Sequence, residues 1–397
     1  MSKKRRDSKN RVLRSGESQR KDGRYAYKYI DTFGNPQFVY AWKLVPTDKT
    51  PAGKREDISL REKVKEIHKD LDDGIDTIGK KMTVCQLYAK QIRHRGNVRY
   101  NTKNGRKRLM KLLEEDKLGG CPIDSVKLSD AKEWAIRMKE KGISYKTISN
   151  DKRSLKAAFY TAIQDDCIRK NPFDFQLNTV IEDDTEPKVP LTPAQEESFL
   201  SFAQNDKVYQ KYYDELIILL GTGLRISELC GLTDTDINFE NRIINVDHQL
   251  LRSAETGYYI ETPKTKSGIR QIPMSEKVYE AFNRVLKRRR GAKAVTIDGY
   301  SNFLFLNRDG YPKTATNYDG MFRGLAKKYN KYHEEALPKV MTPHTLRHTF
   351  CTNMANAGMN PKALQYIMGH SNITMTLNYY AHATFDSAKA EMLRIAA

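Results

Sequence analysis

Three helix starts in the second half of the chain carry the same two-residue signal. In each, a threonine or asparagine that can cap a helix stands before a proline, which suits the first helical position. The pairs are Thr192-Pro193, Thr342-Pro343 and Asn360-Pro361. Gly221 follows an apolar run over 212–220, and Gly369 follows the segment opened by Asn360, as glycine often does at helix ends. The second half is therefore predicted to be mainly helical.

Alternation of polar and apolar side chains predicts the strands. In the second half, residues 243–252, 258–262 and 269–273 are expected to form a small antiparallel sheet, before an amphipathic helix over 275–290. At the start, strands around 11–16, over 24–30 and over 37–44 are expected, with a helix over 59–71. The second strand places Tyr25, Tyr27 and Tyr29 on one face. That face fits a core or a base-stacking platform, and burial habits favour the core.

The middle of the chain is predicted to be all-helical. Its helices are expected over 83–92, 101–115, 129–141 and 144–163. The expected fold class is multidomain α+β. Its parts are an N-terminal three-stranded sheet plus helix over 1–80, a helical domain over 82–174, a linker over 175–190, and a mainly helical domain with a small antiparallel sheet over 191–397.

The chain is basic, with 69 Lys and Arg against 49 Asp and Glu and a net charge of +20. The surplus is uneven, because 42 basic and 24 acidic residues lie in 1–174, against 27 and 25 in 175–397. Such asymmetry favours a nucleic acid partner over a merely solvated surface, since counterion release drives binding to a polyanion. The candidate phosphate contacts are Arg5, Arg6, Arg24, Lys28, Arg106, Lys107, Arg108, Lys152 and Arg153.

The five cysteines are scattered without a CxxC pair, so neither a disulfide framework nor a zinc site is expected. No apolar run approaches a membrane span, and the basic start lacks the apolar segment of a signal peptide. We therefore expect a cytosolic protein with no membrane partner.

Candidate functional residues cluster in the last third of the chain. His344 and Arg347 lie three apart at a predicted helix start, where backbone amides favour an anion. His344 and His348 could instead pair as metal ligands, but a zinc-protease helix would need glutamate where Thr345 stands. His370 follows Gly369 and is expected at an exposed turn, where it can donate to a phosphate.

Arg225 follows a glycine break after a buried helix and needs an anion or an acidic partner at that depth. Glu228 could be that partner, or it could orient Arg225 towards a phosphate. Lys264 and Lys266 lie in the turn before the last strand, and a lysine can protonate a departing oxygen. Tyrosine is a poor nucleophile at a pKa of about 10 and needs cationic neighbours.

Taken in order, these motifs resemble the tyrosine recombinase family of phage-type integrases. The matching residues are Gly223-Leu224-Arg225-Ile226-Ser227-Glu228, Lys264, His344-x-x-Arg347, Met368-Gly369-His370 and Tyr379. The N-terminal part is similar to that of integrases from conjugative transposons of Gram-positive bacteria. In the family a histidine precedes the nucleophile by nine positions, which selects Tyr379 over Tyr380. A Lys-Thr step in the hairpin favours Lys264 over Lys266.

The resemblance implies a recombinase that cuts and rejoins double-stranded DNA through a 3′-phosphotyrosine link, with no cofactor, metal ion or ATP. It implies recognition of core and arm-type sites, and a homotetramer in which a helix over 381–395 docks on a neighbouring subunit. An excisionase and host DNA-bending proteins are the expected accessory partners, and the bacterial nucleoid is the expected location.

Three other functions remain open on the residues alone. A type IB topoisomerase uses the same constellation to relax supercoils. A metal-dependent nuclease or transposase would need a carboxylate cluster for its ions. A regulator that binds DNA without cutting it would explain the charge but not the array of Arg225, Arg347, His370 and Tyr379.

Overall fold

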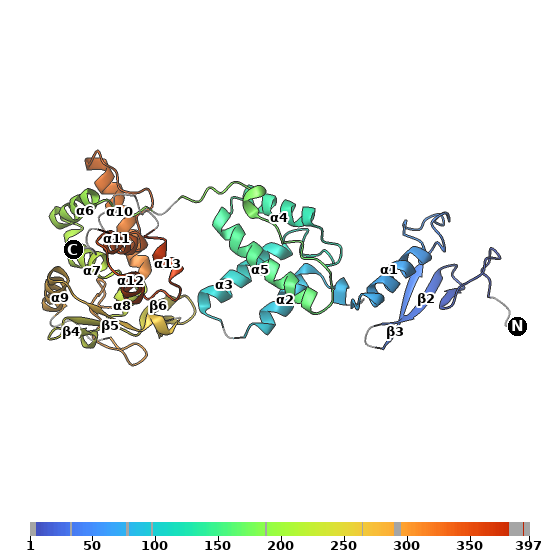
Figure 1. Cartoon of the computed structure of the whole chain (residues 1–397), viewed down its shortest axis with the longest axis horizontal. Coiled ribbons are helices and arrows are strands. Elements are labelled where there is room, and N and C mark those ends of the chain that lie inside the picture. Colours follow the sequence, from blue (N-terminus) through green and yellow to red (C-terminus); the bar gives the residue numbers. More distant parts are fainter. Residues whose placement is uncertain are drawn as a thin grey trace. The chain divides into compact units, whose positions relative to one another are not determined.

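The computed structural model describes residues 5–31, 34–76, 79–96, 98–186, 189–263, 265–289, 295–380 and 392. The chain forms two compact units, residues 1–186 and 187–397 (Figure 1). The first unit contains both the predicted sheet domain and the predicted helical domain. The finer domain boundaries at 80, 82, 174 and 191 remain a prediction. None of the helices in the described ranges is long and apolar enough to cross a membrane.

An antiparallel sheet and one helix make up the start of the first unit. The strands are β1 (Glu17–Gln19), β2 (Tyr25–Ile30) and β3 (Pro36–Ala41), in that order, and the helix is α1 (Leu60–Asp72). The tyrosine face of β2 is core, since Tyr25 and Tyr27 are buried in a cluster with Leu60. The expected strand around 11–16 is wrong. There Val12 makes a single bridge to Arg6, and the first strand begins at Glu17.

The rest of the first unit is helical, as predicted. Its long helices are α2 (Val84–His94), α3 (Tyr100–Glu114), α4 (Leu128–Glu140) and α5 (Tyr145–Gln164). Their core contains the fully buried rings of Trp134, Phe159 and Phe173. The linker over 175–190 remains a prediction, and within it Leu177 and Ile181 are buried in this same core. Apolar side chains at those two positions anchor the segment, although it lacks helical periodicity.

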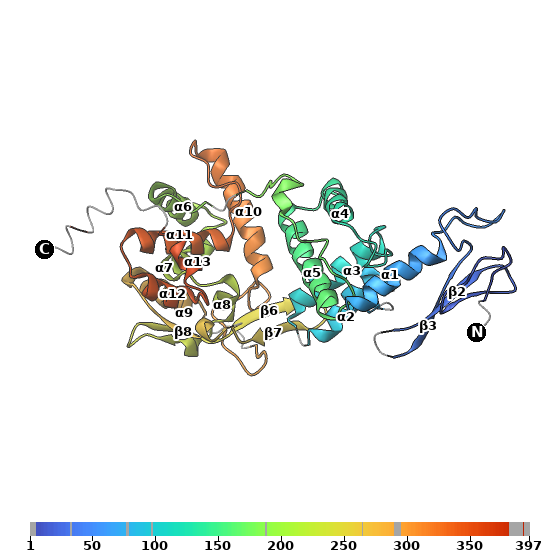
Figure 2. The ribbon, with the colours of Figure 1, turned by 45° about the vertical axis from the view of Figure 1, so that its right-hand side comes forward.

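The second unit is mainly helical, with its strands gathered along one edge (Figures 1 and 2). The helices are α6 (Pro193–Asn205), α7 (Tyr213–Thr222), α8 (Ile226–Gly231), α9 (Glu276–Arg289), α10 (Ala315–Tyr332), α11 (Pro343–Asn356), α12 (Pro361–Met368) and α13 (Thr374–Leu377). All three cap-proline pairs begin helices as predicted, at α6, α11 and α12. The apolar α7 packs against both α9 and α11 and forms the centre of the unit. It ends at Thr222, so the predicted end at Gly221 was slightly early.

The small antiparallel sheet predicted for this unit is present, but the predicted strands divide between a sheet and a separate hairpin. Strands β4 (Ile237–Asn238), β5 (Ile243–Val246) and β8 (Arg270–Pro273) form one antiparallel sheet. Strands β6 (Gln249–Ser253) and β7 (Gly257–Glu261) form a separate hairpin. The run predicted as one strand over 243–252 is interrupted at His248, which is buried and hydrogen-bonded to the end of α8. This interruption lets β6 leave the sheet and contact α8.

Candidate active site

A glycine break places Arg225 at the start of α8. Gly223 caps α7 in the left-handed conformation, with φ of 63°. A Cβ at this position would lie 2.4 Å from Cδ1 of Phe350, so glycine meets both the backbone and the space requirement. The chain then turns into α8 with Arg225 as its first flanking residue, and the Arg225 side chain keeps 33% of its surface exposed.

Glu228 lies buried in α8, and its carboxylate accepts four hydrogen bonds. Its Oε1 accepts from Nη1 of Arg225 at 2.6 Å and from Nη1 of Arg270 at 3.1 Å. Its Oε2 accepts from the Arg225 backbone N–H at 2.8 Å and from Nη2 of Arg270 at 2.9 Å. Burial acts to raise the pKa of Glu228, but Arg270, then Arg225 and Arg347, lower it to about 2. Glu228 is therefore ionised at neutral pH, and it is a partner of two arginines rather than one.

Arg270 is a member of the cluster that sequence reasoning missed. It is the first residue of β8 and its side chain is 0% exposed. A signal for it exists, because Arg270 and Ile272 occupy alternating inward positions of the strand, and both are buried. A charged residue in phase with the buried positions of a strand predicts a buried ion pair.

Three arginines converge on the C-terminal end of α12. The guanidiniums of Arg225, Arg270 and Arg347 each donate to one backbone carbonyl there. The accepting carbonyls belong, in the same order, to Gly369, Ile367 and Met368. The last carbonyls of a helix lack intrahelical partners and carry partial negative charge, which favours cations. The helix end thus gathers arginines from α8, β8 and α11.

The cluster carries more positive than negative charge. Arg347 is 4% exposed and also donates to the carbonyl of Gly223. Burial, and then the neighbouring Arg225, lower the pKa of Arg347 to about 9, so it is still protonated at neutral pH. Among the described residues, this cluster holds three guanidiniums and one carboxylate, Glu228, which pairs with Arg225 and Arg270 but not with Arg347. The site is electrostatically suited to receive an anion.

His370 is buried beside these arginines, so the exposed turn predicted for it is wrong. Only 5% of its surface is exposed, and its Nδ1 lies 3.0 Å from Oγ1 of the buried Thr376. Burial, and then the charges of Arg347 and Arg225, lower the pKa of His370 to about 4. The ring is therefore neutral at neutral pH. In the tautomer in which the Thr376 hydroxyl donates to Nδ1, the ring proton lies on Nε2, where it can be donated to a ligand.

Tyr379 follows α13 and lies half-buried near Arg347. Its ring packs against that of His348, with centroids 4.7 Å apart and an interplanar angle of 58°. Burial and Cys351 raise the pKa of Tyr379, whereas Arg347 lowers it. Its neighbour Tyr380 belongs to the same small hydrophobic cluster, but the Tyr380 hydroxyl donates to the carbonyl of Met359. The two adjacent tyrosines therefore have different surroundings.

The remaining predicted site residues are His344, Lys264 and Lys266. His344 is exposed in the first turn of α11 and lies near enough to His370 to help lower its pKa. Lys266 is exposed in a short turn before β8. Lys264 lies outside the described residues. The structure thus brings together Arg225, Glu228, Arg347, His370 and Tyr379, with His344 beside them.

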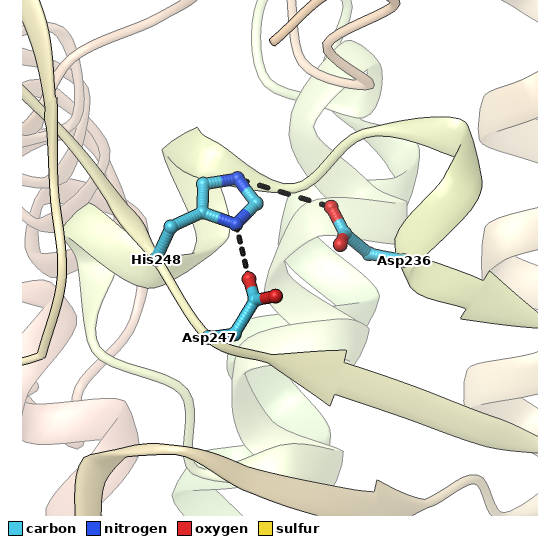
Figure 3. Close-up of side chains that lie close together, drawn as sticks. All are labelled: Asp236, Asp247 and His248. Carbon is cyan, nitrogen blue, oxygen red and sulfur yellow. Dashed lines mark hydrogen bonds and ion pairs between the residues drawn. The ribbon is translucent and has the colours of Figure 1, made fainter. Parts of the chain in front are cut away.

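One group of potential metal ligands occurs within the described part of the chain, and it lies apart from these residues. It consists of Asp236, Asp247 and His248 (Figure 3). Nδ1 of His248 lies 2.5 Å from Asp247 Oδ1, and Nε2 lies 2.7 Å from the carbonyl of Gly231. Both ring nitrogens of His248 therefore lie within hydrogen-bond distance of acceptors of this chain. We interpret the group as a hydrogen-bond network that joins the end of α8 to β6.

The predicted phosphate contacts of the first unit differ in their surroundings. Arg108 donates to both oxygens of the buried Asp151, and Lys152 donates to the carbonyl of Phe175. These two have intramolecular roles. Arg24 pairs with Asp22 and lies over the ring of Tyr40. Five others are exposed and one is half-buried: Arg5, Arg6, Lys28, Lys107 and Arg153, and then Arg106. Their contact with DNA remains a prediction.

Comparisons with known proteins agree on one family. A model described as the phage integrase family matches residues 190–387, and one described as the DNA-binding domain of Tn916 integrase matches residues 1–71. The transposase from transposon Tn916 of Enterococcus faecalis is 69% identical over 395 residues, which cover 100% of this chain and 97% of that protein.

Solved structures of the Tn1549 transposon integrase, residues 82–397, are similar as well. The Y379F variant in complex with transposon right end DNA has 78% identity and a TM-score of 0.75, covering 80% of this chain and 100% of that one. The R225K variant in complex with a circular intermediate DNA has 78% identity and a TM-score of 0.76, covering 79% and 99%. This chain therefore belongs to the phage integrase family and is a tyrosine recombinase of the conjugative transposon type.

Proposed function

We propose that Arg225 and Arg347 hold the non-bridging oxygens of one DNA phosphodiester while Tyr379 attacks its phosphorus. The observation that carries this proposal is the uncompensated positive charge next to a phenol. The described cluster holds three guanidiniums, and its single carboxylate, Glu228, pairs with only two of them, Arg225 and Arg270. A phosphodiester supplies the missing negative charge, and the exposed third of Arg225 gives it a route of contact.

Each proposed step exchanges one ester bond to phosphorus for another, so the phosphate remains a diester. The Tyr379 hydroxyl loses its proton to solvent as its oxygen bonds to phosphorus. The bond to the 5′-oxygen breaks, that oxygen takes up a proton, and a 3′-phosphotyrosine link and a 5′-hydroxyl result. The arginines and the Nε2 proton of His370 stabilise the charge that develops on the non-bridging oxygens, and His344 adds a further donor. A 5′-hydroxyl from a second duplex then reverses the step. Because the bond energy stays in the protein–DNA link, no ATP enters the scheme. The arginines and His370 provide the charge stabilisation that a metal ion would otherwise supply, so no Mg²⁺ enters it either.

The leaving 5′-oxygen needs a proton, and we assign its delivery to Lys264 from its place in the sequence. Lys264→Ala should cleave ordinary DNA at least about 100-fold more slowly, which is a typical loss for a general acid. A substrate with sulfur at the bridging 5′ position should restore cleavage, since sulfur leaves without a proton. The matched variant Lys266→Ala should cleave both substrates normally. If instead Lys266→Ala needs the sulfur, the role belongs to Lys266.

We infer that the DNA substrates are the ends of a mobile element and its circular intermediate. The Tn1549 relatives bound to such DNA support this inference. Core-site binding is assigned to the helical part of the first unit. Exchange of residues 381–395, of which only residue 392 is described, would join four subunits. An excisionase and host DNA-bending proteins complete the proposed assembly.

Arm-type DNA recognition is assigned to the outer face of the N-terminal sheet. Phe38 and Tyr40 are exposed there at 55% and 37%. The guanidiniums of Arg20 and Arg24 lie over the Tyr40 ring, 5.2 and 5.5 Å from its centroid. Lys28 is also exposed on β2. Cations and aromatic rings on a solvent-facing sheet suit contact with a DNA groove.

A joining assay with two duplexes tests the proposed function. In EDTA, the full chain should form a covalent protein–DNA adduct on a nicked substrate and exchange strands between two duplexes that carry the element's ends. A type IB topoisomerase would form the adduct and relax a supercoiled plasmid, but it would yield no joined product. Cleavage that disappears in EDTA would identify a metal-dependent nuclease instead.

A further inference from the structure

Arg270 is a fully buried side chain that joins α8 and α12 in the candidate active site. Its side chain is 0% exposed, and it lies in β8, just after the turn in which Lys266 stands. Nη1 and Nη2 donate to the two oxygens of Glu228 at 3.1 and 2.9 Å. Nη1 also donates to the carbonyl of Gly268 at 3.0 Å, and Nε to that of Ile367 at 2.6 Å. All three nitrogens of its guanidinium therefore serve neighbouring chain segments.

Arg270 limits how Arg225 can bind Glu228, because the two arginines share the same carboxylate. The two Arg270 bonds occupy one lone-pair site on each carboxylate oxygen, and Arg225 uses the other two through its Nη1 and its backbone N–H. Glu228 therefore holds Arg225 at a single point of its guanidinium. Nη2 of Arg225 is then fixed by the carbonyl of Gly369 at 3.0 Å. Without Arg270, a buried carboxylate with unmet acceptor capacity would draw further Arg225 donors to itself.

The same side chain also fixes the place of α12 relative to α8. Arg270 joins Glu228 in α8 to the carbonyl of Ile367 in the last turn of α12. His370 stands three residues beyond that carbonyl. A larger residue is disfavoured at Gly369, which has a φ of 61° and where an added Cβ would lie 3.1 Å from the carbonyl oxygen of Ser267 and 3.2 Å from Nη1 of Arg270.

We infer that Arg270 is a positioning residue for cleavage, which holds Glu228 so that Arg225 presents its remaining donors to the DNA phosphate. This inference rests on the proposed function of Arg225. Arg270 itself is too deeply buried to contact DNA. Lysine cannot take its place, because a single ammonium cannot form the planar, divergent bonds that the guanidinium makes to Glu228 and two carbonyls.

A double-mutant cycle tests the inference with Arg225→Lys, Arg270→Lys and the double variant. The single-turnover rate of covalent adduct formation is measured on a nicked substrate, together with DNA affinity by gel shift. Arg270→Lys should slow adduct formation at least about 10-fold and change affinity less than about 2-fold. In the Arg225→Lys background, the same change should slow it by no more than about 2-fold, because residues that act as one unit are not additive.

Arg284→Lys is the matched control, since Arg284 donates to the buried Asp214 at 2.8 Å elsewhere in the same unit. It should leave adduct formation within about 2-fold of wild type. Independent, multiplicative losses from Arg225→Lys and Arg270→Lys would overturn the inference, as would an Arg270→Lys variant with wild-type cleavage. Failure of the wild-type chain to form any adduct would instead reject the proposed function.

A second variant covers the case in which Arg270→Lys does not fold. Arg270→Gln combined with Glu228→Gln removes one positive and one negative charge, so no carboxylate is left buried without its partner. This double variant should fold and bind DNA, but it should form the adduct at least about 10-fold more slowly than wild type. A wild-type rate in this variant would show that Arg225 needs neither partner and would overturn the inference.

Discussion

Tyr379→Phe is expected to bind DNA as wild type does and to form no covalent adduct on a nicked substrate. The variant removes one oxygen, which is the atom proposed to bond to phosphorus. The ring can keep its packing against His348, with centroids 4.7 Å apart, so the fold should persist. We expect adduct formation to fall by more than about 1,000-fold, because no neighbouring group can replace a covalent nucleophile. Denaturing gel electrophoresis of the protein–DNA mixture measures it.

Tyr380→Phe is the matched control for that result. The Tyr380 hydroxyl donates to the carbonyl of Met359, so its removal costs one hydrogen bond, which is worth about 1 kcal/mol of stability. This variant should still form the adduct. Loss of the adduct in Tyr380→Phe, with its persistence in Tyr379→Phe, would move the nucleophile to Tyr380.

Local chemistry explains which structural predictions succeeded. Thr192 and Asn360 accept hydrogen bonds from backbone N–H groups of the first turn, and Thr342 precedes its helix with a proline after it, so the sequence alone places those helix starts. The strand over 243–252 failed for a reason outside the run itself. Its interruption depends on the buried His248, which bonds to the carbonyl of Gly231, 17 residues earlier in the chain.

The site shows the same limit. The pair of Arg225 and Glu228 is three residues apart and was open to prediction, whereas Arg270 joins Glu228 across 42 residues. The burial of His370 was missed because it depends on Thr376 and on arginines from other segments, not on the Gly369 turn alone. Motif order thus predicted which residues meet, but not how deeply they lie.

Glu228→Ala is expected to destabilise this unit strongly. The substitution removes the one carboxylate that pairs with Arg225 and Arg270 and leaves buried guanidiniums without compensation. Breaking a buried ion pair from one side typically costs about 3–5 kcal/mol in the free energy of unfolding. Urea denaturation of the isolated variant measures this loss. Glu276→Ala is the control, because its pair with Arg242 is exposed and should contribute about 0–1 kcal/mol.

A second variant, Glu228→Gln, shows whether the charge of Glu228 is what stabilises the fold, because the stability that the charge contributes depends on pH. The folded chain lowers the pKa of Glu228 to about 2, whereas an unfolded glutamate has a pKa of about 4.3. The stability that ionised Glu228 contributes is therefore complete above about pH 5 and declines as the pH falls from there towards 2. The gap in unfolding free energy between wild type and Glu228→Gln should narrow over that range. A gap that stays constant as the pH falls would mean that Glu228 stabilises the fold by packing rather than by its charge.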